Sequence, residues 1–203
     1  MPRIKTKHRE EARNQIIVAA LAVATEKGWD AVTLDAIAQH VGVTKPALYS
    51  YFENREALLR DVLFEVFQNI VALLEPTIAH DDDIHRIIRN LAELFFEQQK
   101  PYANLFFQIP IRMIHDQKSG EEFSRIIDTC RGIIHDSLVR AQAGGGLSHE
   151  IDPDESTNAI ILMAMGIHVG SSVMDLDANT AKMIWITSVE KLLLIEPVNG
   201  NQQ

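Results

Sequence analysis

The chain has 203 residues, 46% of them hydrophobic, and a net charge of −9. This composition is typical of a globular protein and excludes a chain that is disordered throughout. The single cysteine, Cys130, excludes an internal disulfide, and the first residues, MPRIKTKHREEARNQ, lack the apolar core of a secretory signal, so we expect a cytoplasmic protein.

The charge is unevenly distributed. Residues 1–60 hold nine Lys/Arg and seven Asp/Glu, a balance of +2, whereas the remainder holds ten and twenty-one, a balance of −11. The basic residues are concentrated near the beginning, at Arg3, Lys5, Lys7, Arg9 and Arg13. A basic end on an acidic body indicates a nucleic-acid contact, although a frayed, solvated terminus would account for these charges equally well.

Three helices are expected in the first 52 residues. The first runs from about residue 10 to residue 27 and ends at Gly28, and its apolar face is formed by Ile16, Ala20, Val23 and Ala24. Thr33 caps a short second helix over residues 34–41, which Gly42 breaks. Thr44 caps a third helix that ends near Phe52. Pro46 is compatible with this helix, because proline is tolerated in a first helical turn.

A long fourth helix follows the cap residue Asn54 and is expected to stop at Glu75, before Pro76. Its apolar residues come in adjacent pairs along its whole length. A stripe that wide packs against more than one neighbour, so this helix is predicted to connect two domains.

The remaining sequence also predicts helices, over residues 83–98, 101–108, 119–143, 153–173 and 178–195, with a glycine break at 144–146. No alternating strand pattern is visible, so the fold class is predicted to be all-α. The most apolar stretch, residues 159–174, is shorter than the roughly 20 residues that a membrane span needs. We expect it to be a buried helix, and we expect no membrane partner.

The segment TLDAIAQHVGVTKPALYSYFENR, residues 33–55, has the pattern of a helix-turn-helix, with Ile37, Val41, Val43 and Leu48 as its buried positions. In this motif the second helix enters the major groove of DNA and reads bases near its beginning. Thr44, Lys45 and Pro46 stand there, and each can contact a base edge. Three side chains further along can donate to phosphates: Tyr49, Tyr51 and Arg55.

The run VGVTKPALYSYFENREALL resembles the recognition-helix signature of the TetR family of regulators, and the resemblance extends over roughly residues 10–63. It implies base contacts from Thr44, Lys45 and Pro46, and phosphate contacts from Thr33, Tyr49, Tyr51 and Arg55. The family more often has lysine at the position of Arg55, and arginine keeps the charge. The alternative is a purely structural role, in which Tyr49, Tyr51 and Phe52 form the core of a small helical bundle. Nearby carboxylates balance the charge of this surface, so the basic arm before Arg13 is expected to supply much of the non-specific affinity.

The resemblance also implies three parts: a helix-turn-helix domain at residues 1–55, a larger helical ligand-binding and dimerisation domain at 56–197, and a disordered tail at 198–203. The function that it implies is a repressor that binds a palindromic operator as a homodimer and is released by a small, largely apolar ligand. The alternative is a helical adaptor that has lost DNA binding.

Small and apolar residues recur on the last two predicted helices and are expected to form the dimer interface: Ala159, Gly166, Gly170, Ile184, Trp185, Ser188 and Leu192. These faces could instead bury one another within a monomer. A ligand pocket is suggested by Phe67, Phe95, Phe106, Phe107, Met113, Phe123, Met163 and Met165. Phenylalanine and methionine at helical spacing are also typical of plain core.

No metal, cofactor or enzymatic activity is expected. The run from His80 to His85 contains imidazoles and carboxylates, but it is better interpreted as an acidic loop that caps the next helix. The sequence shows no nucleophile elbow, no phosphate-binding glycine loop and no His-Glu-x-x-His motif.

Overall fold

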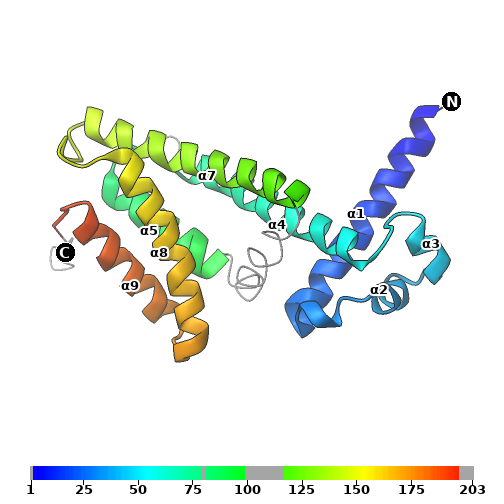
Figure 1. The fold of residues 1–203 in the computed structure, drawn as a ribbon. Helices are drawn as coiled ribbons and strands as arrows, with labels where there is room; N and C mark the ends of the chain where they lie inside the picture. Colours follow the sequence, from blue (N-terminus) through cyan, green and yellow to red (C-terminus); the bar gives the residue numbers. More distant parts are fainter. Residues whose placement is uncertain (1, 79–80, 99–116, 197–203) are drawn as a thin grey trace, which may run out of the picture.

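The computed structural model describes residues 2–78, 81–98 and 117–196 (Figure 1). Throughout these ranges the chain forms helices and the turns between them, without strands, which confirms the all-α prediction. One lobe holds the N-terminal helices and the other holds the C-terminal helices, and α4 (Arg55–Ile78) runs between the two (Figure 1).

The N-terminal lobe consists of α1 (Pro2–Lys27), the short turn η1 (Trp29–Ala31), α2 (Leu34–Val41) and α3 (Lys45–Tyr49). Helix α1 begins eight residues earlier than expected, because Pro2 suits a first helical position and the basic residues after it are good helix formers. Its predicted apolar face is buried, and Gly28 ends it with a φ of 81° that other residues rarely adopt.

Helix α4 packs against α1 at one end and against the C-terminal helices further along, as its wide apolar stripe predicts. Asn54 caps it, accepting a hydrogen bond from the Ala57 amide at 2.8 Å. The expectation that Pro76 stops the helix was wrong, since α4 continues to Ile78. Pro76 lies two residues before the end of α4, where the missing N–H of proline removes only one hydrogen bond from the helix. The side chain of Ile78 is fully buried and holds the last turn in place.

The C-terminal lobe contains α5 (Ile84–Glu93), a π-helical turn η2 (Leu94–Gln98), α7 (Gln117–Ala143), α8 (Pro153–Met174) and α9 (Ala178–Leu192). These agree with the predicted helices to within a few residues, except that the helix predicted at 101–108 lies outside the described residues. Asp83 caps α5 as predicted, accepting from the amides of His85 and Arg86.

The core of this lobe is continuous, with α7 packed against α4 and α8, and α9 packed against α8 and α5. Its largest fully buried side chain is that of Trp185. Within the described ranges, no helix, α8 included, combines the length and the apolarity that crossing a membrane requires.

Candidate DNA-recognition surface and ligand cavity

Helices α2 and α3 form the predicted helix-turn-helix, and local hydrogen bonds fix its geometry. The Thr33 hydroxyl accepts from the Ala36 amide at 3.1 Å, and the Thr44 hydroxyl accepts from the Ala47 amide at 3.4 Å. Gly42 makes the turn between the helices with a φ of 76°. Leu48 is fully buried, which holds α3 against the lobe.

Two details of this motif differ from the prediction. Val43 was expected in the core but is 39% exposed, because the turn after Gly42 carries its side chain outward. Helix α3 ends at Tyr49 rather than near Phe52, since the Ser50 hydroxyl donates to the Ala47 carbonyl at 2.6 Å and closes the last turn. Only five residues are therefore helical, and the beginning of α3 provides most of its accessible surface.

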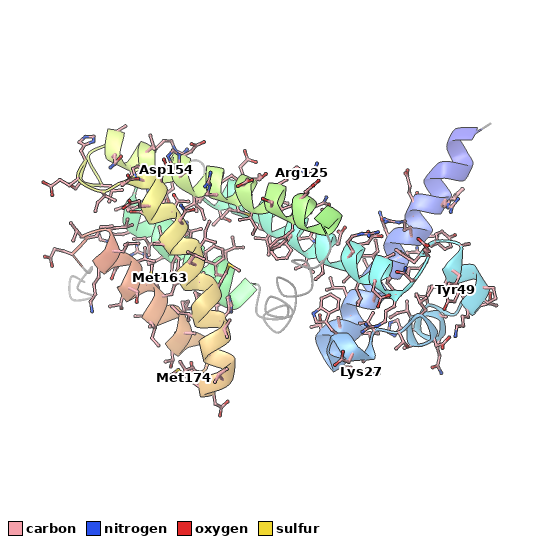
Figure 2. All side chains as sticks on the ribbon, in the orientation of Figure 1. Lys27, Tyr49, Arg125, Asp154, Met163 and Met174 are labelled. Atoms are coloured by element: carbon pink, nitrogen blue, oxygen red, sulfur yellow. The ribbon has the colours of Figure 1, made fainter. Side chains whose placement is uncertain are left out.

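The predicted base-reading residues Thr44, Lys45 and Pro46 are all exposed, and so is Tyr49. Figure 2 places Tyr49 at the outer end of the N-terminal lobe, far from the C-terminal helices. Tyr51 is half-buried, so the alternative that these aromatic residues form the core of a small helical bundle applies to it in part. That alternative does not apply to the exposed Tyr49. Phe52 is buried, as that alternative requires.

Lys45 forms an ion pair with Asp35 across the motif, at 2.8 Å from Nζ to the carboxylate. The hydrogen bond with Asp35 raises the pKa of Lys45, so its ammonium group stays charged at neutral pH. Both partners are exposed to solvent, where ion pairs are weak. A DNA acceptor can therefore replace Asp35 with little loss.

Arg55 is half-buried and has intramolecular partners. Its Nε donates to the Val32 carbonyl and its Nη2 donates to the Trp29 carbonyl, both at 2.6 Å. The guanidinium thus ties the start of α4 to the segment before α2, and its predicted phosphate contact stays a prediction. Sequence spacing shows a cation near the recognition helix, but it does not show which backbone oxygens fold against that cation.

Arg13 and, within the predicted arm before it, Arg9 also have intramolecular partners. Arg13 pairs with Asp61 of α4 and lies over the Phe52 ring at 5.3 Å, so its charge is neutralised inside the lobe. Arg9 donates to the Ser50 carbonyl at 2.8 Å while it lies over the Tyr51 ring at 5.8 Å. Arg9 thus joins α1 to the end of the recognition helix.

An apolar cavity of about 80 Å³, partly open to solvent, lies between the helices of the C-terminal lobe. It is lined from α4 by Phe67, Ile70 and Leu74, from η2 by Phe95, from α7 by Phe123, Ile127, Cys130 and Ile134, and from α8 by Ile161, Ala164, Met165 and His168. Phe67 and Phe123 meet edge to face, with their ring centroids 4.7 Å apart.

The cavity brings together three of the predicted ligand residues, Phe67, Phe95 and Phe123, and also Met165. Met163 does not line it, because the cavity face of α8 is set by residues 161, 164, 165 and 168, and position 163 is turned away from that face. Phe106, Phe107 and Met113 lie outside the described residues.

Two titratable side chains line this cavity, and sequence analysis assigned neither to it. Burial raises the pKa of the Cys130 thiol to about 11. Burial also lowers the pKa of His168, against the opposing effect of a hydrogen bond with the Phe95 backbone. Both groups are therefore neutral near pH 7. The signal that could have found His168 is its spacing of seven from Ile161 and four from Ala164 on a single helix face.

The predicted dimer residues are not all on the surface. Trp185 is fully buried within its own chain, where its indole donates to the Ile160 carbonyl at 3.3 Å, so its assignment to the interface was wrong. Gly166 and Ile184 are exposed, whereas Ala159, Gly170, Ser188 and Leu192 are half-buried.

A larger exposed apolar face accompanies them, of which the predicted dimer residues include only Ile184. It consists of Leu162, Met165, Val169, Val173 and Met174 of α8 together with Met183 and Ile184 of α9. Helices α8 and α9 lie side by side at the end of the molecule opposite α3 (Figure 1). Apolar area of this extent on neighbouring helices is typical of an interaction surface.

Residues 16–62 match the family model of the bacterial regulatory proteins of the tetR family. The HTH-type transcriptional activator FasR of Mycolicibacterium smegmatis is 33% identical over 89 residues, which are 44% of this chain and 41% of FasR. The match thus spans less than half the length of that relative. IcaR of Staphylococcus epidermidis, an HTH-type negative transcriptional regulator of the biofilm operon icaADBC, is 24% identical over 152 residues, 74% of this chain and 78% of IcaR.

The fold is also that of a solved regulator. The structure of the transcriptional regulator FadR from Bacillus subtilis in complex with stearoyl-CoA superposes with a TM-score of 0.71 at 19% identity, covering 88% of this chain and 96% of that chain. An identity this low supports the fold alone.

Proposed function

Because the chain belongs to the TetR family and is a DNA-binding transcriptional regulator, we propose that it represses transcription by binding a palindromic operator as a homodimer, and that a small apolar ligand releases it. This role is regulatory and not enzymatic, and it places the protein in the cytoplasm, where its DNA is. The observation that carries the proposal is the exposure of Thr44, Lys45, Pro46 and Tyr49 at the outer end of the N-terminal lobe.

In the proposed complex α3 enters the major groove with its beginning toward the bases. Thr44 and Lys45 donate to base edges, Lys45 after leaving Asp35, and Pro46 contacts a thymine methyl group. Tyr49 and Tyr51 donate to phosphates of the DNA. Thr33, which is exposed at the start of α2, also contacts a phosphate. Arg55 holds the segment from Trp29 to Val32 in place, and its remaining N–H groups donate to a phosphate in the proposed complex.

The proposed domains of the chain have separate functions. Residues 1–55 bind DNA, and residues 56–197 bind the ligand and the second subunit, with α4 continuous between them. Residues 198–203 are proposed to be a disordered tail. The second subunit is proposed to cover the exposed face of α8 and α9, where the same residues of each copy would meet across a two-fold axis.

The apolar cavity supports the effector part of the proposal. It is lined by α4, which leads to the recognition domain, and by α8, which also carries most of the exposed apolar face, with Met165 belonging to both. A ligand that enlarges the cavity would favour a different relative position of these helices, and hence a different separation of the two recognition helices. FadR in its complex with stearoyl-CoA is a regulator of this fold with an acyl ligand. Repression is proposed because the longer of the two alignments is with the negative regulator IcaR.

The test is a selection of the purified chain against random duplex DNA, beside a Lys45→Ala/Tyr49→Ala double variant. A Lys27→Ala variant is the control, because Lys27 is exposed at the end of α1 away from Tyr49 (Figure 2). A palindrome enriched by the wild-type chain and the control, and lost with the double variant, is expected. Enrichment by all three would contradict the assignment of α3, and enrichment by none would favour the adaptor alternative. A reporter gene placed downstream of the site then distinguishes repression from activation of transcription. Activation by the chain would refute the proposed repression.

A further inference from the structure

The described residues that line the effector cavity carry no fixed charge. Among them there is no Asp, Glu, Lys or Arg, and the wall consists of aliphatic and aromatic side chains apart from Cys130 and His168. Transfer of an ion into such surroundings is costly unless a partner compensates it. Permanently charged ligand groups, cationic or anionic, are therefore excluded from the interior. The one lining side chain that readily takes up or gives up a proton near neutral pH is His168.

The imidazole of His168 is held in a fixed orientation. It stacks on the Phe96 ring, with centroids 4.7 Å apart and an angle of 23° between the planes. It also makes a hydrogen bond to the backbone of Phe95, in the π-helical turn η2. A polar group immobilised in an apolar wall is the arrangement by which binding pockets fix the orientation of a ligand.

The identity of the ligand's polar group follows from proton affinity. A carboxylic acid can enter neutral, or it can share its proton with the imidazole as an ion pair, and both forms are compatible with a site that has no other charge. A primary amine would arrive as a cation and find no carboxylate in the wall. An ester presents no proton and can make no such pair.

We propose that His168 is a specificity-determining residue of this cavity and that it selects apolar ligands carrying a carboxylic acid, an inference that rests on the proposed effector role of the cavity. The ligand's tail is short. A volume of about 80 Å³ is below the roughly 150 Å³ of an engineered apolar cavity that accepts benzene. The flexible side chain of Met165 allows some enlargement.

The experiment is calorimetric titration of the full chain at pH 7 with three probes small enough for this cavity: propanoic acid, its isomeric ester methyl acetate, and propylamine. The wild-type chain is expected to bind the acid at least tenfold more tightly than the ester, and the amine most weakly. His168→Phe keeps an aromatic ring over Phe96 and should bind acid and ester equally. His168→Gln keeps a donor and an acceptor and should retain part of the preference. Met163→Leu, on α8 but turned away from the cavity, is the control and should keep the full preference.

The ratio of acid to ester affinity is compared within each variant, so a general loss of stability cancels. An unchanged ratio in His168→Phe would overturn the assignment of the selecting residue. Equal binding of acid and ester by the wild-type chain would overturn the inference and leave the cavity as an apolar effector site. Binding of none of the three would remove both the selectivity and the effector role, while the DNA selection, which needs no ligand, would still decide the DNA assignment.

Discussion

The proposed dimer predicts a large effect from one surface substitution, Val169→Asp. Val169 lies on α8 between Leu162 and Val173, within the exposed apolar face, and it is 45% exposed in the single chain. In an isologous dimer the face meets its own copy, so each substitution enters the interface twice. The variant should fold as the wild-type chain does and should fail to dimerise.

The magnitude follows from burial. Complete burial of a valine side chain stabilises by roughly 1.5–3 kcal/mol, and nearly half of Val169 remains to be covered, so each copy contributes about 1 kcal/mol to association. Two copies contribute about 2 kcal/mol, which alone raises the dimer Kd about thirtyfold. An aspartate adds the cost of desolvating a carboxylate, which amounts to several kcal/mol per ion. We therefore expect the Kd to rise by at least about a thousandfold.

Sedimentation velocity over a range of concentrations measures this Kd. Val139→Asp is a matched control, because Val139 is 42% exposed on α7, outside the face of α8 and α9. The control should dimerise as the wild-type chain does, and operator affinity should follow dimerisation in both variants. If the two aspartate variants had the same dimer Kd, the α8–α9 face would not be the interface, and the proposed two-fold arrangement would be refuted.

Three further predictions concern single groups. Arg55→Ala should lower the free energy of unfolding by about 2–4 kcal/mol in urea titration, because two carbonyls lose a charged donor, and a loss confined to DNA binding would contradict the structural role. Burial raises the pKa of Cys130 to about 11 from 9.0, so alkylation by iodoacetamide at pH 8 should be at least about a hundredfold slower in the native than in the unfolded chain, and equal rates would refute it. Because the pKa of His168 is lowered below 6.5, the unfolded state binds the proton first on acidification, and stability should fall below pH 6.5 by up to about 1.4 kcal/mol per pH unit. His168→Gln should remove this part of the slope.

Local chemistry made the helix-turn-helix predictable. Thr33, Gly42, Thr44 and Asn54 each act through hydrogen bonds or backbone conformations within a few residues of themselves, and the structure shows each of them in the expected place. The helix ends were less predictable. Pro76 was expected to end α4, but its effect was outweighed by the burial of Ile78, which depends on packing from other helices.

Tertiary contacts account for what the sequence did not show at the candidate sites. Arg55 has the chemistry of a phosphate ligand, and only the folded path of residues 29–32 brings two carbonyls to it. Trp185 shares a helix with the exposed Ile184, and the aromatic rings of η2 hold it inside the lobe.

Helix α8 shows a limit of periodicity itself. It is apolar on nearly every side, with Ile161 and His168 toward the cavity and Leu162 and Val169 toward solvent. A helix without a polar face does not show by its sequence which side lines a cavity and which side lies on the surface of the subunit. The sequence therefore indicated that α8 is covered, but it did not indicate which elements cover each side.

The continuity of α4 has a mechanical consequence. Phe67, on the cavity wall, lies twelve residues from Arg55, which at 1.5 Å per residue places them about 18 Å apart on one rigid rod. A tilt of about 5° would displace one end relative to the other by about 1.6 Å, far more than the few tenths of an ångström that a hydrogen bond tolerates. Arg55 joins the start of α4 to the segment ahead of α2, so this segment would have to move with the helix or lose its hydrogen bonds. In the proposed complex, a ligand that tilts α4 from around Phe67 would thereby displace α3 from the bases without a hinge in the chain.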